Sequence, residues 1–306
     1  MLQLLIGTDI PFMRVRRYAY LFSGALLLAT LVWVLVNGGP KMSVDFAGGT
    51  LLQIQASRVL PVEDVRKTLD GLGLAGAEIQ STGGGDEFLL RFAKQGSADA
   101  FTRIRTALEA RFPGTAVELR REETVGPKVG DELAGKAVWA ILGSLLGILV
   151  YVGFRYEFKF AIGAVISLFH DVVIVFGILC FAGREMSLTV VAALLTLAGY
   201  SINDTIVVFD RIRERMKTLS KETHERAFDI AINETLSRTI ITAFTVFLSS
   251  VALYFFGGEV INDFALAMVV GVVFGTYSSI YVASALALEM WNLYDRRRKP
   301  ARARAA

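Results

Sequence analysis

Six long hydrophobic stretches alternate with polar segments along this chain. They cover residues 18–36, 137–154, 160–182, 187–209, 239–256 and 264–288. A helix of about 20 apolar residues crosses the hydrocarbon core of a bilayer. All six prolines lie outside these stretches, so each stretch can form a continuous helix that satisfies its own backbone hydrogen bonds, as lipid requires. The pattern predicts a polytopic α-helical membrane protein with six transmembrane helices.

Residues 37–133, between the first two of these helices, follow a different pattern. A glycine-rich turn at residues 82–86 separates two short strands and indicates a hairpin, not a phosphate-binding loop. The expected elements are a strand within 43–55, a helix at 61–72, strands at 77–81 and 87–93, a helix at 97–112 capped by Ser97, and a strand at 115–124. This βαββαβ order predicts a small ferredoxin-like α+β domain.

Lys and Arg are distributed unevenly between the segments that flank the predicted helices. The N-terminal segment 1–17, the links after the second and fourth helices, and the tail 289–306 together hold 18 of them, whereas the two short links on the opposite side hold one, Arg184. Basic residues stay in the cytoplasm during membrane insertion. We therefore expect both termini in the cytoplasm, an extracytoplasmic domain at 37–133, and helices two to six within 134–288.

Composition and motifs exclude several classes of protein. A mean hydropathy of +0.51 excludes an intrinsically disordered chain. The chain has one cysteine and two histidines, and it contains no GxxxxGKS/T, HExxH or GxSxG motif. We therefore expect no catalytic residue, no metal site, no cofactor and no nucleic-acid partner, and we predict a transport subunit in place of an enzyme.

Asp204 and Arg238 are ionisable residues at the cytoplasmic ends of the fourth and fifth predicted helices. Such residues are costly in lipid and indicate function. At 1.5 Å per residue, Asp204 lies about 8 Å inside the end of its helix, and Arg238 lies near the same depth. We expect them to pair, so that a proton on Asp204 releases Arg238. The alternatives are a static ion pair or a helix–helix hydrogen bond for Asp204 and a snorkelling anchor for Arg238.

His170 and Asp171 lie in the middle of the third predicted helix. Successive helix positions diverge by about 100°, so the two side chains should not share one narrow face. Asp171 aligns with Gly163 and Ser167 in a small, polar stripe that predicts a packing seam. His170 is either a structural hydrogen-bonding residue or part of a proton path.

Five ordered stretches carry a family resemblance. They are Val44-Asp45-Phe46-Ala47-Gly48-Gly49-Thr50, His170-Asp171-Val172, the run from Gly199 to Glu214, Arg238-Thr239-Ile240-Ile241-Thr242 and the run from Ser279 to Leu288. These stretches resemble the SecD/SecF family of export proteins, and the last four resemble its SecF members in particular. The resemblance covers nearly the whole chain after the first dozen residues.

The resemblance implies one half of a transporter of the RND superfamily in the bacterial inner membrane. The other half is SecD, and the pair assists the SecYEG channel, often with YajC and YidC. The family uses the proton-motive force to pull the translocating preprotein outward after SecA has pushed it in. The spacing of the residues does not by itself indicate protein export, which comes from the resemblance. Asp204 by itself does not distinguish protons from sodium ions as the coupling ion.

The same resemblance assigns roles to residues of this chain. Asp204 and Arg238 fall on the positions of the family's proton path. His170, Asp171, Asn203 and Asp210 are secondary members of that path or structural polar residues. Asp45, Phe46, Gly48 and Gly49 form the motif at the base of the outer domain, where the role looks structural.

Two other functions fit the residue pattern. A small-molecule exporter of the same superfamily needs a substrate pocket, and an outer domain of residues 37–133 is small for that purpose. A scaffold that only holds SecD or the channel would tolerate Asn at position 204 but not a bulky residue at Gly271. Gly143 with Gly147 and Gly271 with Gly275 form GxxxG pairs, which predict contact faces for helices of this chain or of a partner.

Overall fold

The computed structural model describes residues 7–74, 77–82, 84–92, 99–156, 158–219 and 222–303. The chain forms two compact units. One comprises Met1–Lys41 with Trp139–Ala306, and the other comprises Met42–Val138. We call them the helical unit and the outer unit and describe each by itself.

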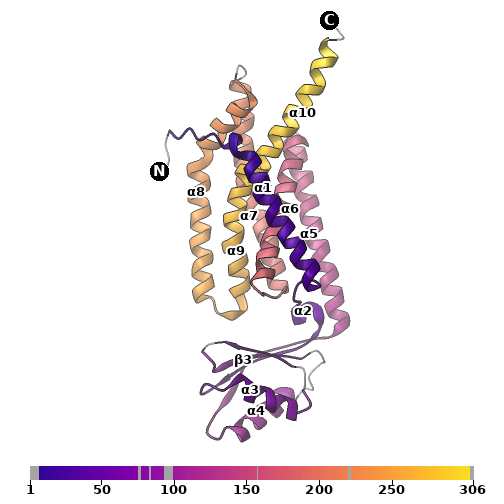
Figure 1. Ribbon diagram of the computed structural model, residues 1–306, viewed down its shortest axis with the longest axis vertical. Coiled ribbons are helices and arrows are strands. Elements are labelled where there is room, and N and C mark those ends of the chain that lie inside the picture. Colours follow the sequence, from indigo (N-terminus) through magenta and orange to yellow (C-terminus); the bar gives the residue numbers. More distant parts are fainter. Residues whose placement is uncertain are drawn as a thin grey trace. The chain divides into compact units, whose positions relative to one another are not determined.

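The helical unit is a bundle of long helices (Figure 1). Its elements are η1 (Phe12–Val15), α1 (Arg16–Asn37), α5 (Pro127–Arg155, shared with the outer unit), α6 (Phe158–Phe181), α7 (Leu188–Thr218), α8 (His224–Phe256) and α9 (Glu259–Ser278), which continues through the π-helical turn η2 (Ser279–Ala283) into α10 (Ser284–Ala303). Within the described residues, six helical segments are long and apolar enough to cross a membrane. The predicted number of transmembrane helices is confirmed.

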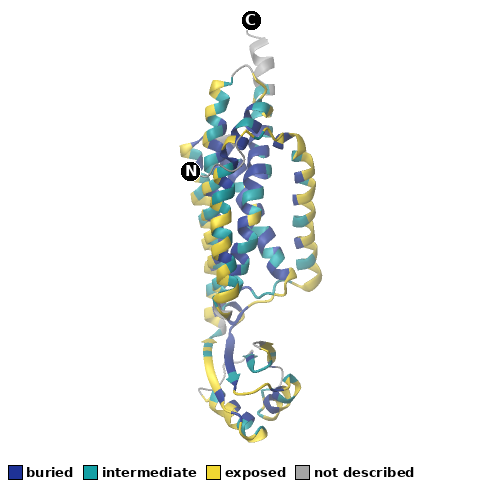
Figure 2. Ribbon diagram, turned by 90° about the vertical axis from the view of Figure 1, so that its left-hand side faces the viewer, coloured by how far each residue is buried: buried dark blue, intermediate teal, exposed yellow. Residues whose placement is uncertain are grey.

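Helices α7 and α8 are longer than the hydrophobic stretches that predict them. The stretch at 239–256 is only the second half of α8, which begins at His224 after Thr223, whose hydroxyl accepts a hydrogen bond from the Arg226 N–H. Figure 2 shows dark blue buried residues concentrated on the inner faces of the bundle and yellow exposed residues on its outer faces. The turns of α8 before residue 239 bury Phe228 and Ile232 in the bundle. Packing of this apolar face therefore extends the helix beyond the apolar run.

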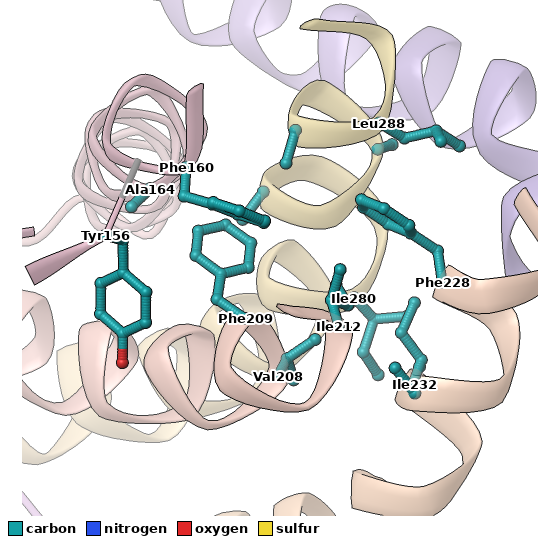
Figure 3. Close-up of a cluster of buried hydrophobic side chains, with 14 of the residues drawn as sticks. Tyr156, Phe160, Ala164, Val208, Phe209, Ile212, Phe228, Ile232, Ile280 and Leu288 are labelled. Atoms are coloured by element: carbon teal, nitrogen blue, oxygen red, sulfur yellow. The ribbon is translucent and has the colours of Figure 1, made fainter. Parts of the chain in front are cut away.

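The core of the helical unit lies where α6, α7, α8 and α10 meet (Figure 3). Phe160 of α6 and Phe209 of α7 are both buried, and their ring centroids are 4.8 Å apart. Phe228 of α8 and Leu288 of α10 point into the same cluster. Close packing of these large side chains fixes the four helices against one another.

Residues 9–13 precede α1 and form a segment that we call the N-terminal strap. Asn233 of α8 forms two hydrogen bonds with the backbone of Ile10, of 3.0 and 2.9 Å. Asp229, one turn earlier on α8, accepts a hydrogen bond of 2.8 Å from the Met13 N–H. Met13 is fully buried. The strap is therefore bound to α8 by polar contacts and by the core.

The outer unit contains a four-stranded antiparallel sheet in the order β2-β3-β1-β4. Its elements are α2 (Val44–Ala47), β1 (Gly49–Ala56), α3 (Val62–Gly71), β2 (Glu78–Thr82), β3 (Glu87–Phe92), α4 (Ala100–Arg111) and β4 (Val117–Val125). Leu52 and Ile54 of β1 lie opposite Leu90 and Phe88 of β3, and all four are buried in one core with Ile104 of α4. The predicted α+β domain between the first and second transmembrane helices is confirmed.

The strand predicted within 43–55 is β1, which begins at Gly49. The residues before it form the short helix α2, at whose start the Ser43 hydroxyl accepts a hydrogen bond of 3.2 Å from the Asp45 N–H. Gly48 and Gly49 then adopt φ values of 71° and 120°, which only glycine adopts readily. Ser97, the predicted helix cap, and Gly83 of the predicted turn lie outside the described residues.

Candidate functional site

Asp204 lies on α7 and faces α8. Its Oδ1 accepts a hydrogen bond of 2.6 Å from the Thr239 hydroxyl of α8. Its Oδ2 is shielded from solvent and accepts no hydrogen bond of ordinary geometry from the described residues, although the Ser279 hydroxyl lies near the carboxylate. A buried charge without a full set of partners is costly, and a proton on the carboxylate removes that cost. The geometry therefore leaves a place for a proton at Oδ2.

The expected ion pair between Asp204 and Arg238 is not formed. Within the part of the chain that the structure describes, no guanidinium nitrogen of Arg238 lies within 4.0 Å of a carboxylate oxygen of Asp204, and Arg238 is exposed. Neighbouring positions on a helix point about 100° apart, and Thr239 occupies the face of α8 that meets Asp204. Arg238 acts on Asp204 through its electric field alone.

Asp171 is the centre of a second polar cluster, which is fully buried. Its Oδ2 accepts hydrogen bonds of 2.8 Å from Ser201 of α7 and 2.7 Å from Ser278 of α9. Its Oδ1 lies 3.0 Å from Nδ1 of His170. The two side chains are 1% and 4% exposed. Both carboxylate oxygens have partners, so this cluster ties α6 to α7 and α9 inside the bundle.

His170 extends the buried cluster toward α1. Its Nε2 lies 2.9 Å from the Ser23 hydroxyl, which in turn lies 3.0 Å from the Tyr277 hydroxyl. The Tyr277 hydroxyl also donates to the backbone oxygen of Ala19 at 2.9 Å. His170 and Asp171 thus contact different helices, α1 on one side and α7 and α9 on the other, although the two adjacent side chains also form a hydrogen bond with each other.

The two carboxylates belong to neighbouring clusters that meet at the end of α9. Thr205, the residue after Asp204, has its hydroxyl 2.9 Å from that of Ser279. The preceding residue, Ser278, donates to Asp171. The structure therefore brings Asp204, Asp171 and His170 into one region of the bundle, joined by hydroxyl side chains.

Asn203 and Asp210 lie outside this region. Both side chains are exposed on α7. Asp210 interacts with the phenol of Tyr156, which follows α5. Burial raises the pKa of Tyr156 to about 12, and the hydrogen bond with the Asp210 carboxylate adds to the rise. The Asp210 carboxylate of α7 thus lies near the residue that follows α5.

The motif of Asp45, Phe46, Gly48 and Gly49 lies entirely in the outer unit. Phe46 is buried. Gly130 of α5 packs so closely on this motif that a Cβ atom there would lie 2.6 Å from the Phe46 carbonyl oxygen. Only glycine fits this approach between backbones, which favours a structural role for the motif.

The glycine pairs differ in what they contact. A Cβ at Gly271 would lie 2.6 Å from Leu197, and one at Gly275 would lie 3.2 Å from the Ser201 hydroxyl, so this pair faces α7. Gly143 and Gly147 of α5 have no described atom within 4 Å of their Cβ positions. The Gly271–Gly275 face is used within the chain, and the Gly143–Gly147 face is open to lipid or a partner.

Sequence reasoning assigned no role in the site to the hydroxyl residues that join it. Ser201, Thr205 and Thr239 lie within the stretches that carry the family resemblance, and Ser23 lies in the first predicted helix. Their signal is a Ser or Thr within an apolar helix, where the hydroxyl must find a partner in a neighbouring helix or its own backbone. That signal does not reveal which partner is chosen.

The chain also matches known proteins of one family. Residues 105–293 match the family model described as protein export membrane protein SecD/SecF, C-terminal. The chain is 45% identical over 285 residues to the protein translocase subunit SecF of Desulfurispirillum indicum, covering 90% of each chain. It is 41% identical over 305 residues to that of Rhodothermus marinus, covering 97% of this chain and 98% of the relative.

The fold also resembles solved structures. The crystal structure of SecDF from Thermus thermophilus, described as a translocon-associated membrane protein, superposes with a TM-score of 0.85 at 39% identity over 94% of this chain. A second structure, SecDF in a super-membrane-facing form, gives a TM-score of 0.71 at 38% identity over 99% of this chain. The chain spans only 40% and 41% of the lengths of these two proteins.

Proposed function

The chain belongs to the SecD/SecF family of protein export membrane proteins, and on this premise we propose that it couples the proton-motive force to export. In this proposal it is the SecF half of a SecDF complex and assists late movement of a preprotein through the SecYEG channel, with YajC and YidC as further partners. Its membrane is the bacterial inner membrane, with both termini in the cytoplasm and residues 37–133 outside.

The unsatisfied Oδ2 of Asp204 carries this proposal. One oxygen of the carboxylate is held by Thr239, while the other is shielded and accepts no hydrogen bond of ordinary geometry. A protonated carboxylate and an ionised one are therefore both compatible with the site, at different cost. Moving one charge through a potential of about 100 mV supplies about 2.3 kcal/mol, so a few protons could drive a substantial motion of the outer unit.

Arg238 contributes to the proposal as a charge at a distance. It is exposed and forms no ion pair with Asp204 within the described residues. Its field favours the ionised form of Asp204, and a proton on Asp204 removes the attraction between them. Arg238 therefore senses the proton without a direct contact to break.

An exposed polar face across α7 and α8 supports SecD as the partner. On α8, residues Arg238, Thr242, Thr245 and Ser249 are exposed at helical spacing. On α7, Thr196, Gly199 and Asn203 are likewise exposed. An ionisable residue in a membrane helix faces protein or water and not lipid, and Arg238 is part of this face. We propose that helices of SecD cover this face and contribute the remaining part of the proton path.

A pulse-chase of a secreted precursor tests the proposal in cells with matched membrane levels of each variant. Asp204→Asn should slow release of the precursor while it keeps association with SecD. Asp210→Asn is the matched control, because it removes an exposed carboxylate from the same helix and should export normally. Wild-type kinetics in Asp204→Asn would contradict proton coupling and favour the scaffold.

A further inference from the structure

Two consecutive serines near the junction of α9 and η2 serve the two carboxylate clusters. The Ser278 hydroxyl donates to Asp171 Oδ2 at 2.7 Å. The Ser279 hydroxyl lies 2.9 Å from that of Thr205, next to Asp204. Both serines are fully buried. Since adjacent helix positions diverge by about 100°, the pair reaches α6 on one side and α7 on the other.

The helix changes its winding at this point. Ser279–Ala283 form a π-helical turn between α9 and α10. The hydroxyls of Ser278 and Ser279 also donate to the Gly275 carbonyl, at 3.1 and 3.0 Å. The Ser284 hydroxyl donates to the Ser279 carbonyl at 2.8 Å. Short π-helical turns inside α-helices are rare, and those that occur often lie at functional sites.

Close packing holds the π-helical turn against its neighbours. A Cβ at Gly163 of α6 would lie 2.9 Å from the Ala283 carbonyl oxygen. On the side of the N-terminal strap, the Phe12 ring meets the Tyr281 ring edge-on, with centroids 5.8 Å apart. A change of winding would therefore alter the contacts of this turn with α6 and with the strap.

We propose that Ser278 and Ser279, held by the π-helical turn, are positioning residues that link the protonation of Asp204 to that of Asp171. This inference rests on the proposed function, in which Asp204 takes up and releases a proton. A proton on Asp204 changes the hydrogen bonding around Thr205 and Ser279, and Ser278, the residue before Ser279, carries that change to Asp171. The link needs no ion pair and no additional ligand.

Among the described residues, a small set of charged and titratable groups surrounds this link. From α6 they are His170 and Asp171, and from α7 the group is Asp204. Arg238 acts from α8 through its field. From α9 and η2 they are the phenols of Tyr277 and Tyr281, which do not ionise near neutral pH. Any coupling seen near neutral pH therefore involves the groups on α6 and α7.

Infrared titration of the chain with its SecD partner in lipid nanodiscs tests the link. The carboxyl C=O bands are assigned with Asp204→Asn and Asp171→Asn. We expect Asp171→Asn to move the titration midpoint of Asp204 by about 1 pH unit, as for interacting sites. In the Ser279→Ala background the same substitution should move it by less than half as much, whereas Ser279→Thr, which keeps the hydroxyl, should restore the shift.

Two further variants distinguish loss of the link from a non-specific effect of removing a buried hydroxyl. Ser284→Ala removes only the hydroxyl that caps the Ser279 carbonyl and should also reduce the shift. Ser250→Ala removes a buried hydroxyl of α8 that donates to Val246 and should leave the shift unchanged. A full shift in both Ser279→Ala and Ser284→Ala would overturn the link, because the coupling would then be an interaction of charges through space.

The outcomes also separate this inference from the proposed function. An Asp204 band that titrates but ignores Asp171 contradicts the link alone. Coupled titration together with normal export by Asp204→Asn contradicts the proposed function alone. Absence of any titrating band from Asp204 contradicts both.

Discussion

The hydroxyl of Thr239 on α8 donates a hydrogen bond of 2.6 Å to Oδ1 of Asp204 on α7. This contact takes the place that an ion pair with Arg238 was expected to occupy. It fixes the orientation of the carboxylate and leaves Oδ2 as the position for a proton. The contact also joins α7 to α8, whose polar faces we assign to the SecD interface.

Replacing Thr239 by Val should alter the pH dependence of export. Val has the shape of Thr without the donor, and a hydrogen bond to a charged group contributes about 1.5–3 kcal/mol. Loss of the donor disfavours the ionised carboxylate, so the pH profile of precursor release should move upward by about 1 unit. Thr239→Ser, which keeps the donor, should retain the wild-type profile, and an unchanged profile in Thr239→Val would exclude a role for this contact.

Adding one methyl group at Gly163 should destabilise the helical unit. The new Cβ would lie 2.9 Å from a backbone oxygen of Ala283, and backbone cannot move away as a flexible side chain can. We expect a loss of about 1–3 kcal/mol, as for overpacked cores, measured as a lower melting temperature of the purified chain. Gly143→Ala, where no described atom lies within 4 Å, should be neutral or stabilising by up to about 1 kcal/mol. Equal melting temperatures for the two variants would argue against the close approach of α6 and η2.

Labelling with a membrane-impermeant maleimide should reveal the orientation of the chain. The native Cys180 is buried and should give little background. Thr102→Cys in α4 and Thr218→Cys at the end of α7 both change exposed residues. In intact spheroplasts, reagent outside should label the first variant only, and in inverted vesicles the second only. The reverse pattern would contradict the assignment of both termini to the cytoplasm.

Acid should loosen the N-terminal strap. A hydrogen bond from Arg226 holds the pKa of Asp9 below its ordinary value, which is about 3.9. The stability from this pair is therefore present above that value and is lost as pH falls through the lower pKa of the folded chain. At neutral pH, Arg226→Gln should speed amide hydrogen exchange in residues 9–13 relative to the control Lys217→Gln.

The acid effect has its own internal comparison. Once the pH is below the lowered pKa of Asp9, the difference between Arg226→Gln and wild type should vanish, because Asp9 is then protonated in both. Asn233→Ala should speed exchange at every pH, since its two hydrogen bonds to Ile10 do not titrate. A difference between Arg226→Gln and wild type that persists in acid would show that the ion pair is not its cause.

The hydrophobic pattern predicted the large features because they follow from one-dimensional rules. Span length and proline placement gave six helices, and strand and turn signals gave the order of the outer unit. The partner of Asp204 could not be predicted, because a shift of one residue along α8 decides whether Arg238 or Thr239 faces α7. The π-helical turn at Ser279–Ala283 also escaped prediction, since its winding depends on hydroxyls and close contacts from three helices.

Precursor translocation into inverted membrane vesicles tests the central claim most directly. The vesicles carry the chain with SecD, and translocation is measured with and without an imposed proton gradient at equal SecA and ATP. The account predicts that the gradient accelerates late translocation with the wild-type chain and with Asp210→Asn, but not with Asp204→Asn. Equal acceleration with Asp204→Asn would contradict the claim that Asp204 couples protons to export.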